Sequence, residues 1–341
     1  MIAGAQQQTP RTDALDQGGQ QPLPLISVAI CTRNRAKLLA RAVESVLPQL
    51  GPDTELLIVD NASTDETPQI VAALAAHNPA VRVCREATPG IPFARNAALV
   101  NARGRYILFF DHDELAEPGW VDAYRDFLIN PPTSNLGCVG GPYIEQHEAP
   151  SPAWLDPHYG SLHISNSTCR LFGWFMPATG NCAYPRELVL RMGGFHPQVA
   201  RQNDTELNDR LRKAGYELWW LESARVRHVI PASRMRFQAQ VRLWQEEGRD
   251  AAVLRWLSRR TRTSRLLLVF GRCLAVVPQL ILRFVGSALL SLIFQRRRAA
   301  RLFLGGCRVL GFMEQLFRME ARELLGDDTP TPVLPVTRPS S

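Results

Sequence analysis

The sequence predicts an α/β fold: a mostly parallel, Rossmann-like sheet that helices cover on both faces, followed by a helical, apolar and basic appendage. Two observations predict the sheet. Short, uninterrupted apolar runs alternate with segments of helical periodicity, and polar residues follow directly after the apolar runs. Continuous apolar strands are typical of parallel sheets buried on both faces, and such sheets bind ligands at the carboxyl ends of their strands.

The predicted elements alternate along the N-terminal half. Apolar runs that fit strands cover Leu25–Cys31, Glu55–Asp60, Val81–Arg85 and Tyr106–Phe110. Helical spacing covers Ala36–Leu47, a segment that ends near Ala76 with Pro68 in its first turn, and Phe93–Asn101. Further along, we expect helices at Arg186–Met192 and Asp204–Ala214, and strands near Cys138–Gly140 and Glu217–Leu221.

The composition divides the chain into four parts. Residues 1–22 are polar and lack the basic and apolar regions of a signal peptide, and residues 327–341 contain four prolines; both are predicted as disordered tails. Residues 23–230 hold the α/β pattern, and residues 231–326 form a helical region expected to associate with a membrane. The seven cysteines are scattered without a C-x-x-C pair, which argues against a zinc site and suits a reducing compartment.

The charge of the chain is uneven. The stretch from Arg225 to Met313 contains 18 arginines against three acids, within a net charge of +7 for the whole chain. Such a region is expected to meet an anionic partner, such as phospholipid headgroups, nucleic acid or a phosphorylated substrate. Nucleic acid is the weaker expectation, because these arginines alternate with aliphatic runs and not with aromatic residues that could stack on bases.

The most apolar segment, Arg265–Phe294, is predicted to lie in the plane of a membrane surface. Its longest uncharged run is twelve residues, short of the roughly 20 needed to span a bilayer. On a helical projection its polar residues form one stripe: Arg265, Arg272, Gln279, Arg283 and Ser287. This stripe, with the cluster Arg296-Arg297-Arg298 after it, favours contact with anionic headgroups. The alternative is a helix docked on the α/β domain with its arginines toward solvent.

The most informative motif is Asp111-His112-Asp113, which follows the apolar run that ends at Phe110. Alternation along an extended chain places Asp111 and Asp113 on one side and His112 on the other. Carboxylate oxygens there suit a divalent cation such as Mg²⁺ or Mn²⁺, which could hold a diphosphate and neutralise a leaving group. The motif alone is also typical of an acidic turn before a helix, so its position after a buried strand is what favours a metal site.

Six segments, in this order, resemble the family 2 glycosyltransferases, which have a GT-A fold. They are ISVAICTRNRAKLLARAVESVL, ELLIVDNASTDET, TPGIPFARNAAL, GRYILFFDHDE, GNCAYPRELVLRMGGFHP and QNDTELNDRLRKAGY. The resemblance implies a GT-A domain and an inverting, metal-dependent transfer of a sugar from a nucleotide-diphosphate donor to an acceptor hydroxyl. It favours a UDP-sugar as the donor.

The resemblance also implies roles for single residues. Donor binding falls to residues at the ends of three strands and to one arginine on a helix: Thr32, Arg33, Asn34, Asp60, Asp111 and Arg95. Metal ligation falls to Asp113, with Asp111 and His228 as further ligands. Each assignment has a structural alternative: Asp60 as a helix cap, Arg95 in a surface ion pair, and His228 as a structural histidine.

The catalytic base is expected to be Asp204. The family places this base in a Glu-Asp pair that opens a helix, and here the pair reads Asn203-Asp204, so the second acid alone remains. One alternative is that Asp204 caps the helix that follows. Another is a pseudoenzyme that binds a nucleotide-sugar without turnover. A nucleotidyltransferase is less favoured, because no Gly-rich or lysine-bearing phosphate loop follows the first strand.

The resemblance implies a role in the synthesis of surface polysaccharide or another glycan, with a saccharide or lipid-linked saccharide as the acceptor. The processive signature Q-x-x-R-W is missing, so one sugar is expected to be transferred per encounter. The basic, apolar C-terminal region favours a peripheral or monotopic enzyme at the cytoplasmic face of the inner membrane, with no nucleic-acid partner. A basic protein that binds RNA or anionic lipid is the alternative.

Overall fold

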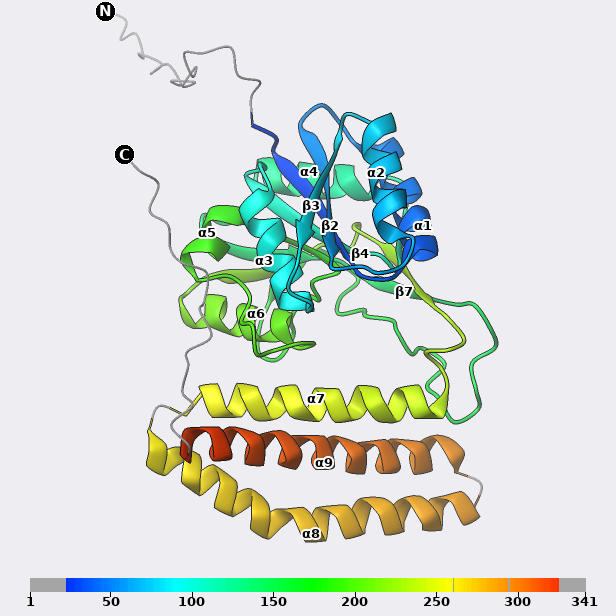
Figure 1. Cartoon of the computed structure of the whole chain (residues 1–341), viewed down its shortest axis with the longest axis vertical. Coiled ribbons are helices and arrows are strands. Elements are labelled where there is room, and N and C mark those ends of the chain that lie inside the picture. Colours follow the sequence, from blue (N-terminus) through cyan, green and yellow to red (C-terminus); the bar gives the residue numbers. More distant parts are fainter. Residues whose placement is uncertain (1–22, 260, 294, 325–341) are drawn as a thin grey trace, which may run out of the picture.

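The computed structural model confirms the α/β fold (Figure 1). It describes residues 23–259, 261–293 and 295–324, so both predicted tails lie outside the described residues. The main sheet has eight strands in the order β3-β2-β1-β4-β9-β6-β10-β8. Their bounds are β1 Ile26–Thr32, β2 Thr54–Asn61, β3 Val81–Glu86, β4 Tyr106–Asp111, β6 Leu136–Gly140, β8 Cys169–Leu171, β9 Asn181–Pro185 and β10 Glu217–Trp220.

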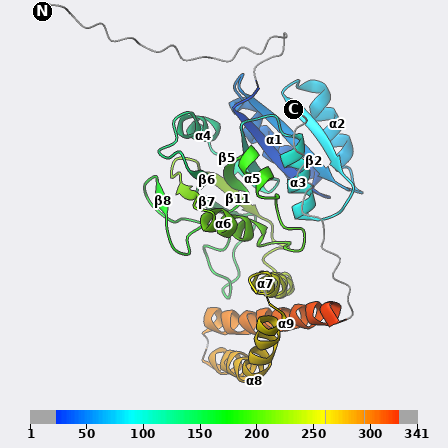
Figure 2. The same cartoon turned by 90° about the vertical axis from the view of Figure 1, so that its left-hand side faces the viewer.

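Helices cover both faces of this sheet (Figure 2). On one face, α1 (Ala36–Val46), α2 (Thr67–His77) and α4 (Trp120–Ile129) pack in the same core as Val28 and Ile30, and a short 3₁₀ turn (Leu47–Gln49) follows α1. On the other face, α3 (Ile91–Asn101), α5 (Arg186–Arg191) and α6 (Asn203–Lys213) pack with Ala29 and Leu57. Successive strand residues point to opposite faces, so each continuous apolar run serves both layers.

A second, three-stranded sheet lies beside the end of β4. It has the order β5-β11-β7, with β5 at Glu114–Ala116, β11 at Val226–Ile230 and β7 at Tyr143–His147. Sequence analysis missed β5, β7, β8, β9 and α4. Strands β5 and β8 have three residues each, and β7 (YIEQH) is mostly polar, so hydrophobic periodicity gives them no signal.

The register of the parallel strands places the polar strand ends side by side. Thr32 of β1 lies opposite Asp60 of β2, and Cys31 of β1 lies opposite Asp111 of β4. The predicted gathering of polar residues at one edge of the sheet is therefore confirmed for these three strands. This edge is where an open α/β sheet binds its ligands.

Three long helices form a layer against the α/β domain: α7 (Phe237–Leu257), α8 (Arg262–Leu292) and α9 (Arg296–Leu324). Figures 1 and 2 both show α9 between α7 and the outermost helix, α8. The backbones of α7 and α9 meet at two glycines. A Cβ atom on Gly248 would lie 2.0 Å from the carbonyl oxygen of Arg308, and one on Gly311 would lie 2.1 Å from that of Gln245.

The polar stripe of α8 faces the other two helices, so both orientations expected from the sequence are wrong. The guanidinium of Arg272 lies 5.2 Å from the ring centre of Phe312 in α9, and that of Arg265 lies 5.1 Å from the ring of Trp256 in α7. Ser287 Oγ donates to the carbonyl oxygen of Ala299 at 2.8 Å. These contacts satisfy the cations on aromatic faces.

The opposite face of α8 exposes large apolar side chains, which we call the apolar face: Leu266, Leu267, Phe270, Leu274, Val277, Ile281, Leu282, Val285, Leu289 and Leu292. Within the described residues, α8 is the one helix that is long and apolar enough to cross a membrane by length and composition. The sequence argument set a span aside because Arg272 and Arg283 interrupt the apolar run. Pro278 lies inside α8, which bends in Figure 1.

Candidate functional site

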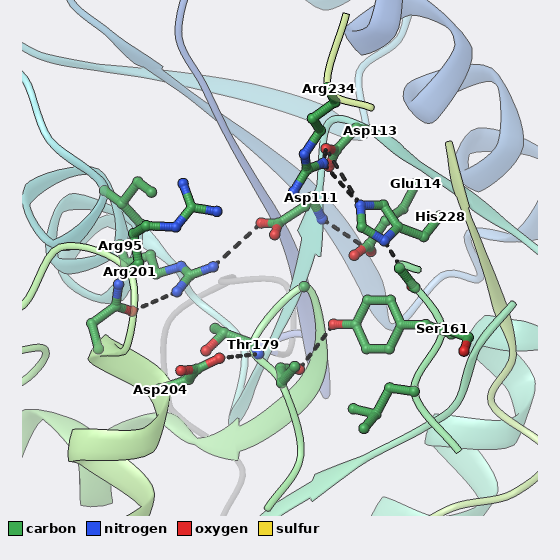
Figure 3. Close-up of a pocket in the computed structure, with 17 residues that line it drawn as sticks. Arg95, Asp111, Asp113, Glu114, Ser161, Thr179, Arg201, Asp204, His228 and Arg234 are labelled. Atoms are coloured by element: carbon green, nitrogen blue, oxygen red, sulfur yellow. Dashed lines mark hydrogen bonds and ion pairs between the residues drawn. The ribbon is translucent and has the colours of Figure 1, made fainter. Parts of the chain in front are cut away.

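The polar strand ends open onto a cavity of about 290 Å³ between the end of β4 and the start of α6 (Figure 3). Five of the predicted site residues line it: Arg95, Asp111, Asp113, Asp204 and His228. The remaining lining comes largely from segments that sequence analysis left unassigned, and includes Glu114, Tyr143, Gly160, Ser161, Thr179, Gly180, Arg201, Asn203 and Arg234.

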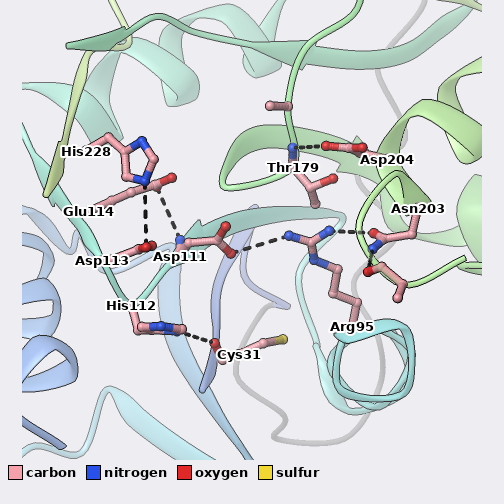
Figure 4. Close-up of polar contacts among 12 residues, drawn as sticks. Cys31, Arg95, Asp111, His112, Asp113, Glu114, Thr179, Asn203, Asp204 and His228 are labelled. Carbon is pink, nitrogen blue, oxygen red and sulfur yellow. Dashed lines mark hydrogen bonds and ion pairs between the residues drawn. The ribbon is translucent and has the colours of Figure 1, made fainter. Parts of the chain in front are cut away.

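The acid motif enters this cavity at the carboxyl end of β4. Asp111 and Asp113 both line the cavity, while His112 turns away and its Nδ1 lies 3.2 Å from the carbonyl oxygen of Cys31 (Figure 4). This is the arrangement that alternation predicts. Gly180 lies close to both acids, because a Cβ there would be 2.2 Å from Glu114 Oε1 and 2.8 Å from Asp111 Oδ2.

Glu114, the next acid in the chain, is fully buried behind the motif. Its Oε2 accepts the backbone N–H of Asp111 at 3.2 Å. Burial, together with the neighbouring charges of Asp111 and Asp113, raises the pKa of the Glu114 carboxyl well above its usual range. The raised pKa favours the uncharged form of this carboxyl, and its hydrogen bond to the N–H of Asp111 supports the end of β4.

Asp113 is held by two residues of the β11 region. Its Oδ2 accepts from Arg234 Nη1 at 2.6 Å and lies 3.6 Å from His228 Nε2 (Figure 3). Burial opposes ionisation of this carboxyl, but the contact with His228 and the charges of His112 and Arg234 hold its pKa well below the usual range. The other nitrogen of His228, Nδ1, lies 2.9 Å from the carbonyl oxygen of Gly160.

The donor set fits a divalent cation in chemistry, with carboxylate oxygens and one imidazole nitrogen. Asp113 and His228 converge, whereas Asp111 Oδ1 is turned toward Arg95 Nη2 at 3.4 Å. Over the described part of the chain, no group of three or more His, Cys, Asp or Glu side chains stands ready to hold a metal ion. Asp113 and His228 are thus the pair that would hold a cation, with Asp111 beside them.

Arg95 is buried, so the alternative of a surface ion pair is wrong. Its side chain is 8% exposed, and its guanidinium lies against the rings of Phe109 and Phe195, 5.9 and 5.7 Å from their centres. Its Nη1 donates to Asn203 Oδ1 at 2.5 Å (Figure 4). Asn203, which stands where the family has its first acid, is therefore a neutral partner of a buried guanidinium.

Asp204 lies in the first turn of α6, one residue beyond the start of the helix. Its Oδ2 accepts the N–H of Thr179 at 3.2 Å and its Oδ1 accepts the N–H of Thr205 at 2.7 Å (Figure 4). The cap position belongs to Gln202, so the alternative role of Asp204 as the helix cap is wrong. Both N–H groups fix the direction of the carboxylate toward the cavity.

The four residues predicted to contact the nucleoside lie outside this cavity. Thr32 and Asp60 are buried at neighbouring strand ends, and Asp60 Oδ1 accepts the N–H of Ser63 at 3.2 Å. The Oγ1 of Thr32 is buried without a hydrogen-bond partner. Arg33, the next residue, is exposed. Thr32 and Asp60 therefore lie at the carboxyl ends of β1 and β2, but they do not line the cavity.

Asn34, the fourth of these residues, connects two loops. It adopts a left-handed backbone conformation (φ 53°), its N–H donates to Ser63 Oγ at 3.0 Å, and its Oδ1 accepts the N–H of Thr64 at 2.7 Å. Asparagine tolerates this conformation better than most residues. The side chain of Asn34 thus fastens the loop after β1 to the loop after β2.

Sequence analysis missed Glu114, Thr179 and Arg234 as residues of the cavity. Thr179 lies beside Asp204, and its Oγ1 is buried without a partner. Glu114 directly follows the acid motif, which was a usable signal. Arg234 was one of 18 arginines in its region, and nothing in its sequence surroundings marks it.

Comparisons with known proteins agree with this fold. Residues 27–190 match the family model "Glycosyl transferase family 2". Chondroitin synthase of Pasteurella multocida is 36% identical over 118 residues, which cover 34% of this chain and 12% of that protein. An uncharacterized glycosyltransferase of Nostoc is 28% identical over 179 residues, which cover 50% of this chain and 54% of that protein. The chain spans less than two thirds of the length of either relative.

A solved structure has the same fold over nearly the whole chain. It is the mannosyltransferase PcManGT from Pyrobaculum calidifontis, in complex with GDP-Man and Mn²⁺. The TM-score is 0.53 at 18% identity, over 90% of this chain and 88% of that one. The fold is therefore the GT-A fold. The part of the chain that the family model matches, residues 27–190, is a family 2 glycosyltransferase domain.

Proposed function

We propose that this protein is an inverting, metal-dependent glycosyltransferase that moves one sugar from a nucleotide-diphosphate donor to a saccharide or lipid-linked acceptor. One observation carries the proposal. A single cavity holds Asp111, Asp113 and His228 on one side and the carboxylate of Asp204 on the other. Displacement at an anomeric carbon with inversion needs stabilisation of the leaving group on one side and a base on the opposite side.

On the donor side, Thr32, Arg33, Asn34 and Asp60 would bind the nucleoside at the ends of β1 and β2. Asp113 and His228, with Asp111 nearby, would hold Mg²⁺ or Mn²⁺, and the cation would neutralise charge on the diphosphate. Arg95 is buried and positively charged, so it adds a second positive charge close to Asp111. A UDP-sugar is the favoured donor, although the structural neighbour binds GDP-Man.

On the acceptor side, Asp204 would take the proton of the attacking hydroxyl. Its carboxylate is oriented by the N–H groups of Thr179 and Thr205, and it lies in the lining of the cavity. Glu206 is excluded from this role by its contacts, because both of its oxygens pair with Arg210 at 2.7 Å.

The relatives support a saccharide acceptor. They are named chondroitin synthase, hyaluronan synthase and succinoglycan biosynthesis protein, so surface polysaccharide synthesis is the process we infer for this chain. The exposed apolar face of α8, with the exposed Arg296, Arg297 and Arg298 beside it, supports attachment to the cytoplasmic face of the inner membrane.

Replacement of Asp113 by Ala tests the metal role. Purified wild-type and Asp113→Ala proteins would be titrated with UDP and GDP, with and without Mn²⁺, in a calorimeter. We expect the Mn²⁺-dependent part of nucleotide binding to disappear in the variant, because the cation loses a carboxylate ligand, and EDTA to have the same effect on the wild type, because it removes the cation.

Asp122→Ala is the matched control, because Asp122 is an exposed acid in the first turn of α4 that pairs with Arg125, away from the cavity and from the strand ends proposed to bind the nucleoside. Full sugar transfer by Asp113→Ala, or by the wild type in EDTA, would contradict the metal role. Metal-dependent binding of a nucleotide-sugar with neither transfer nor hydrolysis would favour the pseudoenzyme that the Asn203 substitution leaves open.

A further inference from the structure

Arg234 occupies the space between the two groups that would hold the cation. Its Nη1 lies 2.6 Å from Asp113 Oδ2 and 3.0 Å from His228 Nε2 (Figure 3). These two ligand atoms are 3.6 Å apart. A metal ion in contact with both atoms would therefore take the place of the Arg234 nitrogen, and the two cations exclude each other.

The contacts of the two ring nitrogens of His228 make this exclusion specific. A carbonyl oxygen can only accept, so the Nδ1 that lies 2.9 Å from the oxygen of Gly160 is the donor nitrogen of the ring. In the tautomer that this contact selects, Nε2 accepts the N–H of Arg234 through its lone pair. The lone pairs that would bind a metal on Asp113 and on His228 are thus both used by one guanidinium.

The backbone of Arg234 is held by hydrogen bonds, whereas its side chain is partly exposed to the cavity. Its N–H donates to the carbonyl oxygen of Pro231 at 2.9 Å, and its own carbonyl oxygen accepts from Gln240 Nε2 at 2.9 Å. Gln240 belongs to α7 and is 1% exposed. The side chain of Arg234 is 33% exposed and lines the cavity, so the guanidinium can turn without moving the chain.

We propose that Arg234 is a tethered competitor of the divalent cation. In the donor-free protein it neutralises Asp113 and blocks the metal position. A nucleotide diphosphate brings the negative charge toward which the guanidinium turns, and the position then becomes open to the cation. This inference rests on the proposed function, and it adds that metal and nucleotide bind together, with Arg234 supplying part of their coupling.

The test is a binding cycle on the full-length protein. The affinity for Mn²⁺ is measured with and without saturating UDP, and in parallel GDP, from the electron paramagnetic resonance signal of free Mn²⁺. Without nucleotide, we expect Arg234→Met to bind Mn²⁺ about tenfold or more tightly than the wild type, because a charge-assisted bond no longer competes. With nucleotide, the gain should shrink by a similar factor. Arg234→Lys keeps the charge and should fall between the two.

Arg201→Met is the matched control. Arg201 lines the same cavity and contacts Glu246 at 3.4 Å, so this variant removes one positive charge without opening the metal position. An equal gain in both methionine variants would show that only overall charge matters and would overturn the proposal. Unchanged nucleotide-free affinity in folded Arg234→Met and Arg234→Lys, with normal Mn²⁺–nucleotide binding by the wild type, would overturn it while the proposed function stands. No Mn²⁺ binding by the wild type even with nucleotide would overturn both.

Discussion

At the scale of single residues, the two aspartates of the acid motif pair with two different arginines from distant parts of the chain. Asp111 contacts Arg95 of α3 at 3.4 Å, and Asp113 contacts Arg234 from the turn after β11 at 2.6 Å. Each carboxylate therefore has its own cationic partner. Ligands that enter must replace these ion pairs, which makes the two arginines part of the binding equilibrium.

The proposed role of Asp204 as the base gives a prediction at the same scale. Asp204→Asn keeps the size of the side chain but removes its ability to take a proton. We expect donor affinity to stay within a factor of two and turnover to fall roughly a hundredfold or more, the usual effect of losing a general base. Single-turnover transfer assays, combined with calorimetric donor binding, separate the two quantities.

Asp209→Asn serves as the control for this variant. Asp209 lies on the same helix, α6, but pairs with Lys213 and is not among the residues that line the cavity. Normal turnover in Asp204→Asn would assign the base to another group, and a similar loss in Asp209→Asn would point to a general effect on the helix.

At the scale of elements, α8 presents its most hydrophobic side to the surroundings and its arginines to α9. This orientation predicts that the apolar face, and not the arginine stripe, contacts lipid. Leu267 and Leu274 are 67% and 66% exposed. Replacing both by Gln should leave the fold intact and weaken binding to lipid vesicles by tenfold or more, since each buried leucine contributes about 1.5–3 kcal/mol.

Co-sedimentation with neutral and anionic vesicles measures this effect. Ile129→Gln is the matched control, because Ile129 is an exposed apolar residue on α4 of the α/β domain. Replacing Arg296, Arg297 and Arg298 by Gln should weaken binding to anionic vesicles more than to neutral ones. Wild-type binding by the double leucine variant would mean that another surface meets the membrane.

At the scale of the whole molecule, the helical layer holds part of the candidate site in place. Asp250 of α7 is buried, and its carboxylate accepts the N–H groups of Ala200, Arg201 and Gln202 at 3.3, 2.5 and 2.8 Å. These residues lead directly into α6 and the pair Asn203-Asp204. The C-terminal helices are therefore connected to the position of the proposed base.

Asp250→Ala should lower both stability and turnover. The variant leaves buried N–H groups without an acceptor, which costs about 1–3 kcal/mol of unfolding free energy. Denaturant unfolding measures the first effect and transfer assays the second. Glu246→Ala, on the same helix, removes only a side-chain contact with Arg201 at 3.4 Å and should change neither by much. A stable Asp250→Ala protein with normal turnover would show that the helical layer does not support the position of the proposed base.

The sequence was sufficient for the sheet and for the part of the site that lies on strand ends. Apolar runs marked β1, β2, β3 and β4, and parallel strands bring Asp60 and Asp111 to one edge by geometry alone. It was insufficient for Arg234 and Asp250, because their partners lie 121 and 48 to 50 residues away in the chain. Periodicity likewise revealed the stripe of α8 but not the helix that covers it, since a pattern on one helix contains no information about its neighbour.

The close glycine contacts between α7 and α9 determine in which surroundings, water or lipid, these two helices stay packed together. Close backbone approach depends on van der Waals contact, whereas side-chain cores in water depend on the release of solvent. Among acyl chains, which are as apolar as leucine, only the first kind of cohesion persists. Gly248 and Gly311 lie where α7 and α9 approach most closely, so the contact between these two helices would persist in either medium. If the proposed contact with a membrane is made, the helix pair that positions the proposed base would therefore stay assembled.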